Sequence, residues 1–173
     1  MHPMLATLTR GGRGSALIAL VSFVVVGSAV ASQVWGGLSP CKLCWYQRYP
    51  YALTIALGLG GALLAGRGAN RAAALLSFWC AVAFLLGATV AAFHVGVEQG
   101  WWQGSTACTG GGAGQGRTVD ELRQLIETAP VIRCDEVQWS LFGVSMAGYN
   151  FLVSLALAAF AALVARTLEH RRP

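Results

Sequence analysis

Two cysteines and an arginine lie close together in the chain and could support redox chemistry. Cys41 and Cys44 are separated by two residues, a spacing that serves disulfide exchange, metal binding or the locking of a loop. Arg48 follows Cys44 by one helical turn. A helix N-terminus and a nearby arginine both favour a thiolate. The spacing therefore predicts a reactive Cys44. Arg48 could be an interfacial anchor, but its place at an apolar margin favours a functional role.

Two further cysteines could form a second redox pair. Cys108 and Cys134 flank the glycine-rich segment 109–116. A bond between them could be a structural staple or a labile disulfide offered to another protein, and the residues leave both open. No metal is predicted, because zinc held by four cysteines usually needs two closely spaced pairs. Cys80 lies in an apolar segment and is predicted to be an inert buried thiol.

The composition indicates a membrane protein. Of 173 residues, 55% are hydrophobic and 11% are charged, whereas a soluble domain carries about 25% charged residues. Apolar segments cover about 15–35, 49–65, 72–95 and 147–164, each near the roughly 17–25 residues that span a bilayer. We expect an all-α membrane protein, a four-helix transmembrane bundle forming a single domain over 1–173. The first segment is longer than the apolar part of a signal peptide, so we expect it to be retained.

The arginines predict the orientation of these spans. The N-terminus, the turn 66–71 and the C-terminal tail would share one side, and the loops 36–48 and 96–146 the other. Because short flanks rich in Lys and Arg stay inside, both termini are predicted to be cytoplasmic. The loop cysteines then lie outside, where disulfides persist. The net charge of +5 reflects this asymmetry, and no basic patch with interleaved aromatic residues predicts nucleic-acid binding.

Two features near the long outer loop remain open. Thr118–Glu121 reads as a capping box that opens a short amphipathic helix, which could lie on membrane lipid or pack on the loop. His94 ends the third apolar segment. It could be an ordinary hydrogen-bonded histidine, or it could contact a lipid-soluble ligand, since histidine titrates near neutrality.

The segment 40–48, Pro-Cys-Lys-Leu-Cys-Trp-Tyr-Gln-Arg, closely resembles the signature of the DsbB family. The similarity continues at 94–102, at Cys134-Asp135 and within 139–150, and so covers most of the chain. This resemblance implies a four-helix protein of the bacterial inner membrane with periplasmic cysteine loops. It also implies that the protein makes disulfides and passes the electrons to quinone.

The resemblance assigns the second pair to the protein substrate. Cys108 and Cys134 would form the disulfide that oxidises a periplasmic partner, a DsbA-like thiol oxidase with a thioredoxin fold. Cys108 is similar to the family cysteine that forms the mixed disulfide with that partner. Electrons would then pass by thiol–disulfide exchange to Cys41 and Cys44.

The resemblance assigns the first pair to the quinone, which would be ubiquinone or menaquinone. Cys44 resembles the family thiolate that forms a charge-transfer complex with quinone. Arg48 resembles the residue that supports quinone binding, and His94 matches a position near the quinone.

Two alternatives are retained. A vitamin K epoxide reductase-like oxidoreductase does similar chemistry, but its two-residue-spaced cysteines follow the loop cysteines, whereas here they come first. A non-enzymatic membrane scaffold would instead hold its loops with inert disulfides. Reduction potentials distinguish the scaffold from a redox relay, since inert structural disulfides lie below about −300 mV and relay disulfides lie well above.

Overall fold

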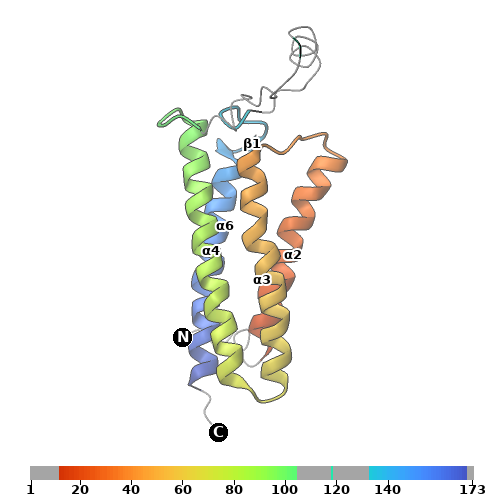
Figure 1. The fold of residues 1–173 in the computed structure, drawn as a ribbon, viewed down its shortest axis with the longest axis vertical. Helices are drawn as coiled ribbons and strands as arrows, with labels where there is room; N and C mark the ends of the chain where they lie inside the picture. The colour runs from red at the N-terminus through yellow and green to blue at the C-terminus, as the bar shows by residue number, and fades with distance from the viewer. Residues whose placement is uncertain (1–11, 105–117, 119–132, 171–173) are drawn as a thin grey trace.

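The computed structural model describes residues 12–104, 118 and 133–170. Four long helices dominate this part of the chain and run side by side along one axis (Figure 1): α2 (Gly12–Val34), α3 (Lys42–Gly66), α4 (Asn70–Glu98) and α6 (Met146–Glu169). Each is long and apolar enough to cross a bilayer. The predicted four-helix membrane bundle is confirmed, and the protein is a multi-pass membrane protein.

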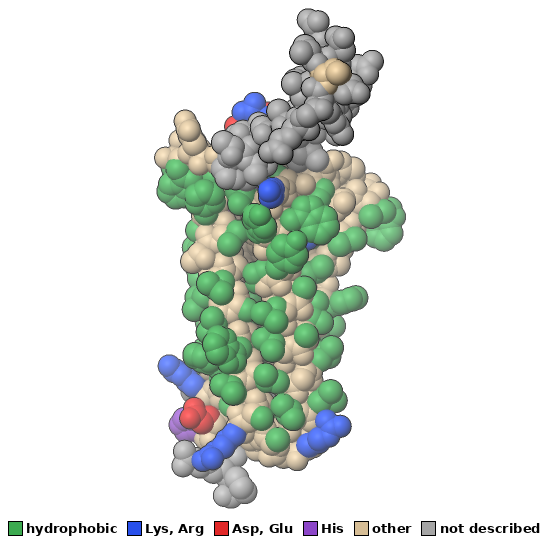
Figure 2. All heavy atoms as spheres, viewed as in Figure 1, with side chains coloured by type: hydrophobic (Ala, Val, Ile, Leu, Met, Phe, Trp, Pro, Cys, Tyr) green, Lys and Arg blue, Asp and Glu red, His purple; other side chains and the backbone are tan. Residues whose placement is uncertain are grey.

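The surface of the bundle is suited to lipid. Figure 2 shows apolar side chains along the bundle, while Lys and Arg gather mainly at its lower end. Large apolar side chains such as Phe23, Leu63 and Leu86 are exposed. Helices satisfy their own backbone hydrogen bonds, so such a surface is stable in a bilayer although no water reaches it.

Helix α3 begins earlier than the apolar pattern predicted. The expected second span was 49–65, preceded by an outer loop to residue 48, whereas the helix begins at Lys42. Hydropathy misses its first two turns because they contain Lys42, Gln47 and Arg48, which are polar. The helix also continues through Pro50. A Cβ on Gly87 of α4 would lie 3.4 Å from the proline ring, so the glycine leaves room for it.

Small residues allow the helices to approach closely. A Cβ on Gly58 of α3 would lie 2.8 Å from the carbonyl oxygen of Ser15 and 2.9 Å from the backbone nitrogen of Ala19, both on α2. Buried hydroxyl groups add polar contacts between helices: Ser15 with Ser77 at 3.1 Å, and Ser22 with Thr54 at 2.9 Å. Close approach and interhelical hydrogen bonds hold membrane helices together, because lipid supplies no hydrophobic drive between them.

A short hairpin precedes α6. Strands β1 (Ser140–Leu141) and β2 (Val144–Ser145) pair antiparallel, and Phe142 and Gly143 between them have positive φ angles of 51° and 78°, as a tight two-residue hairpin turn requires. Ser145 then caps α6, and its hydroxyl donates to Glu98. The last turn of α4 is thereby tied to the first turn of α6.

Several predicted features lie outside the described residues. They are Cys108, the glycine-rich segment 109–116 and the amphipathic helix expected after Thr118.

The close approach of α2 and α3 generates a stability prediction. Gly58→Ala should lower the free energy of unfolding by about 1–3 kcal/mol, because its methyl group meets backbone atoms that cannot move aside. Reversible unfolding in mixed detergent micelles would measure this. Gly27→Ala is the matched control, since a Cβ there meets nothing within 4 Å. Equal stability of the two variants would contradict the packing argument.

Candidate functional site

The first cysteine pair is organised by the N-terminus of α3. Cys41 is the N-cap residue, and its sulfur accepts a hydrogen bond of 3.3 Å from the backbone nitrogen of Cys44. The Cys41 thiol donates in turn to the Cys44 sulfur at 2.9 Å. Cys41 is 3% exposed and Cys44 is half-buried. Helix capping therefore brings both sulfurs together beside a helix N-terminus.

The hydrogen bonding gives the two sulfurs different roles. The hydrogen bond to Cys44, together with burial, raises the pKa of the Cys41 thiol to about 12, although His94 acts in the opposite direction. Cys41 thus keeps its proton and offers it to Cys44. The Cys44 sulfur is the acceptor, which suits it to carry a negative charge.

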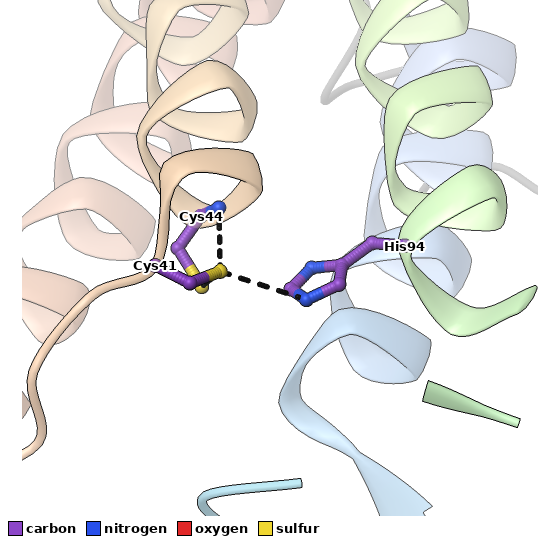
Figure 3. A group of neighbouring side chains, drawn as sticks. All are labelled: Cys41, Cys44 and His94. Carbon is purple, nitrogen blue, oxygen red and sulfur yellow. Dashed lines mark hydrogen bonds between the residues drawn. The ribbon is translucent and has the colours of Figure 1, made fainter. Parts of the chain in front are cut away.

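His94 approaches this pair from α4. Its Nε2 lies 3.6 Å from the Cys41 sulfur (Figure 3), and its Nδ1 lies 2.8 Å from Nε2 of Gln47. The ring is 4% exposed, and Glu98 Oε1 lies 3.8 Å from its Nε2. Of the two roles left open for His94, the hydrogen-bonded one is observed, with Cys41 and Gln47 as partners. Contact with a ligand stays a prediction.

Cys134 reaches the same place from a distant part of the sequence. It is 1% exposed and belongs to a buried cluster with Cys41, Leu43 and Val97, against which Cys44 packs. Its backbone also hydrogen-bonds to His94. One member of the predicted second pair therefore lies against the first pair. Its predicted partner, Cys108, falls outside the described residues.

A cavity of about 690 Å³ opens beside the pair. Apolar residues of α2 and α6 form much of its wall, and Cys44, Arg48 and His94 all border it. Pockets for small organic ligands are typically about 300–1,000 Å³ and mostly apolar, with a few polar groups that fix orientation. The cavity therefore fits a lipid-soluble molecule with a polar head.

Arg48 is held at the wall of this cavity. Its guanidinium donates to Gln33 Oε1 at 3.1 Å and to the carbonyl oxygen of Ala29 at 3.3 Å, both on α2. It also lies 4.8 Å from the ring centre of Trp45. Arg48 follows Cys44 on α3 by about one turn, as the spacing predicted, and both border the cavity. Its positive charge is thus positioned for an electron-rich group near the Cys44 sulfur.

The cluster also has the spacing of a metal site. Ligand atoms of Cys41, Cys44 and His94 all lie within 4.8 Å of one another. Reduced thiols and an imidazole at such distances suit a thiophilic ion such as zinc. His94 could be a metal ligand only if the ring nitrogen that faces the sulfurs carries a lone pair. If that nitrogen carries a hydrogen, His94 is a hydrogen-bond donor instead.

The sequence reasoning did not identify four polar residues of this site. Gln47 and Asn150 are hydrogen-bonded to each other, Gln33 supports Arg48, and Glu98 lies beside His94. Amide or acidic side chains within membrane-spanning segments are costly and often functional. That signal could have found Gln33 and Asn150, which fall within the expected segments 15–35 and 147–164. It could not have found Gln47 or Glu98, which fell outside the expected segments. Cys80 lies apart from this site, in the hydrophobic core of the bundle.

The unequal roles of the two sulfurs can be tested by alkylation. In the reduced protein, limiting iodoacetamide near pH 8 should modify Cys44 before Cys41, because Cys41 remains a thiol until the pH approaches about 12. Peptide mass spectrometry would count the modified sites. Cys80, buried in the core, is the internal control for unfolding. Faster modification of Cys41 would contradict the assignment.

Comparisons with known proteins agree with this arrangement. The model of the family described as "Disulfide bond formation protein DsbB" matches residues 13–164. Disulfide bond formation protein B of Verminephrobacter eiseniae is 32% identical, covering 91% of this chain and 90% of that protein. Disulfide bond formation protein B 1 of Pseudomonas fluorescens (strain ATCC BAA-477) is 28% identical, covering 89% and 82%. The protein RP370 of Rickettsia prowazekii is 26% identical, covering 83% and 81%.

No solved structure matches the chain. The family model nevertheless covers all four helices almost completely, and Cys41 and Cys44 both border the cavity. The chain belongs to the DsbB family and is a membrane oxidoreductase of disulfide bond formation.

Proposed function

We propose that this protein oxidises a soluble DsbA-like partner through Cys108 and Cys134 and relays the electrons through Cys41 and Cys44 to a membrane quinone. The observation that carries the proposal is the position of Cys44. Its sulfur accepts the Cys41 thiol hydrogen and borders a largely apolar cavity beside Arg48. A redox-active sulfur at this position would meet a lipid-soluble acceptor across a mainly apolar wall.

The packing of Cys134 supports the transfer between the two pairs. Disulfide exchange requires a thiolate to attack a disulfide sulfur directly, and Cys134 is buried against Cys41. Attack of Cys134 on the Cys41 sulfur would form a Cys41–Cys134 bond and break the Cys41–Cys44 bond. The electron pair of the broken bond would remain on Cys44, at the cavity.

The cavity supports the assignment of quinone. Its apolar wall suits a ring and an isoprenoid tail, and Arg48 could donate to a carbonyl oxygen, which becomes more negative on reduction. His94 borders the same space. A quinone supplies the two-electron acceptor, taking up two electrons and two protons for each disulfide made. Ubiquinone and menaquinone share this chemistry.

The distribution of charge supports an inner-membrane location with both termini in the cytoplasm. The ends of the helices opposite the cysteine pair carry four arginines (Figure 1): Arg13, Arg67, Arg71 and Arg166. Short positively charged flanks remain on the cytoplasmic side. The cysteine pair would then face the periplasm, where a soluble thioredoxin-like partner can reach the long loop.

The decisive experiment follows quinone reduction by the purified protein. With a reduced DsbA-like partner and ubiquinone, the parent should turn over repeatedly. Cys44→Ser should fall to the uncatalysed rate and lose any visible absorption that quinone produces with the reduced protein, because no thiolate remains at the cavity. Cys80→Ser, with its change in the distant core, should keep turnover. Unimpaired turnover of Cys44→Ser would rule the proposal out.

A second experiment tests the role of Arg48. Arg48→Ala should raise the KM for quinone about tenfold, as expected from losing a hydrogen bond to a charged group, while the KM for the partner protein changes little. Steady-state assays that vary each substrate in turn would separate the two values. Lys42→Ala is the control, since Lys42 is an exposed cation near the same helix start. An unchanged quinone KM would exclude the role.

A further inference from the structure

A chain of hydrogen-bonded side chains runs inward from His94 through three helices. Gln47 of α3 contacts His94 Nδ1 at 2.8 Å through its amide nitrogen and accepts, at its carbonyl oxygen, a hydrogen bond from the Asn150 amide of α6. Asn150 Oδ1 accepts from the Tyr51 hydroxyl at 2.7 Å, and Ser154 lies 2.8 Å from that hydroxyl. We call Gln47, Asn150, Tyr51 and Ser154 the amide relay.

The amide relay has a direction. Each amide has one donating end and one accepting end. In the structure Asn150 turns its Oδ1 toward the hydroxyls of Tyr51 and Ser154 and its nitrogen toward Gln47. The Gln47 oxygen accepts from it, which leaves the Gln47 nitrogen as the donor to His94. Reversing Gln47 alone would bring two donating nitrogens together.

This direction determines where the ring of His94 carries its proton. Nδ1 faces a donor and must accept, so a neutral ring carries its hydrogen on Nε2. The groups near Nε2 agree, because the Cys41 sulfur lies at 3.6 Å and the Glu98 carboxylate at 3.8 Å, and both can accept. Glu98 is itself held by the Ser145 hydroxyl. Two independent sets of contacts therefore place the hydrogen on the same nitrogen.

We propose that the amide relay makes His94 a fixed hydrogen-bond donor to the Cys41 sulfur, with Gln47 and Asn150 as positioning residues. Cys41 then accepts from two N–H groups, the imidazole and the Cys44 backbone. These donors stabilise a thiolate on Cys41, as charge-assisted hydrogen bonds do.

This inference rests on the proposed function for its role in the relay. When the Cys108 thiolate attacks the Cys134 sulfur of a Cys41–Cys134 disulfide, a Cys108–Cys134 bond forms and the Cys41–Cys134 bond breaks. The electron pair of the broken bond leaves on Cys41 as a thiolate. His94 stabilises that leaving group without transferring a proton, so the step needs no general acid. The Cys41–Cys44 bond is then restored as the quinone takes up the two electrons that the two thiolates release.

The orientation of the amide relay also disfavours metal binding by Cys41, Cys44 and His94. A nitrogen that carries a hydrogen has no lone pair for a metal, so His94 would face the two sulfurs as a donor and not as a ligand. Metal-binding histidines need the opposite arrangement, with the far nitrogen protonated and donating to an acceptor. Gln47 presents its donating nitrogen at that position.

Nuclear magnetic resonance of ¹⁵N-histidine tests the proton position directly. The full-length protein in micelles contains only three histidines, and His94→Gln identifies the resonances of His94. We expect the hydrogen on Nε2 in the parent. In Asn150→Asp it should move to Nδ1, because a carboxylate only accepts and Gln47 must then turn its oxygen toward the ring. A parent ring with its hydrogen on Nδ1 would overturn the proposal.

Thiol reactivity tests the consequence for Cys41. In a variant whose other cysteines are replaced by serine, the rate of iodoacetamide reaction against pH reports the Cys41 thiolate. His94 faces that sulfur from α4, and Glu98 lies beside the same ring nitrogen. Positions 44 and 134, which also lie near Cys41, carry serine in this variant. At a fixed pH below the midpoint of that profile, adding Asn150→Asp should slow alkylation roughly tenfold, as expected for losing one hydrogen bond to an anion.

Gln99→Glu is the matched control for Asn150→Asp. It makes the same change from amide to carboxylate at an exposed residue that ends α4, and it should alkylate at the parent rate. Equal rates in Asn150→Asp and the parent would overturn the donor role. Neither experiment contains quinone or a partner protein, so a failure of the proposed quinone reaction would leave both results interpretable.

Discussion

The capping of α3 by the Cys41 sulfur is the interaction on which the site depends. Because that sulfur accepts from the Cys44 backbone, the helix begins at Lys42, Cys44 lies in its first turn and Arg48 lies about one turn further. Successive residues of a helix are about 100° apart around its axis, since a helix has about 3.6 residues per turn. Cys44 and Arg48, four residues apart, therefore lie on one face of α3, and both border the cavity.

The polar residues within the spans are tolerated because they bond to one another. Gln47, Tyr51, His94 and Asn150 come from three helices and form one connected network. Among the described residues, no buried side-chain nitrogen or oxygen lacks a hydrogen-bond partner. Lipid cannot replace a missing partner, so these contacts hold α3, α4 and α6 in one register. The contacts that stabilise the outer half of the bundle also orient the histidine beside the redox pair.

The features that could be predicted from sequence are those that depend on one segment of the chain at a time. Long apolar segments predicted four membrane-spanning helices, because helix length and hydrophobicity are nearly sufficient in a bilayer. The apolar segment 49–65 starts seven residues after α3 itself, because Gln47 and Arg48 are polar and hydropathy does not reveal their partners on α2, α4 and α6. The importance of Cys44 and Arg48 could be anticipated, since four residues of separation place side chains on one helix face.

The sequence by itself determined the class of protein, the number of spans and the family. Only the tertiary structure placed Cys134 against that motif and built the cavity between α2 and α6. It alone joined Gln47 to Asn150, which are far apart in sequence. The physical reason is that hydropathy and helical spacing act within one segment. The partner of a buried sulfur or amide depends on which helix faces it.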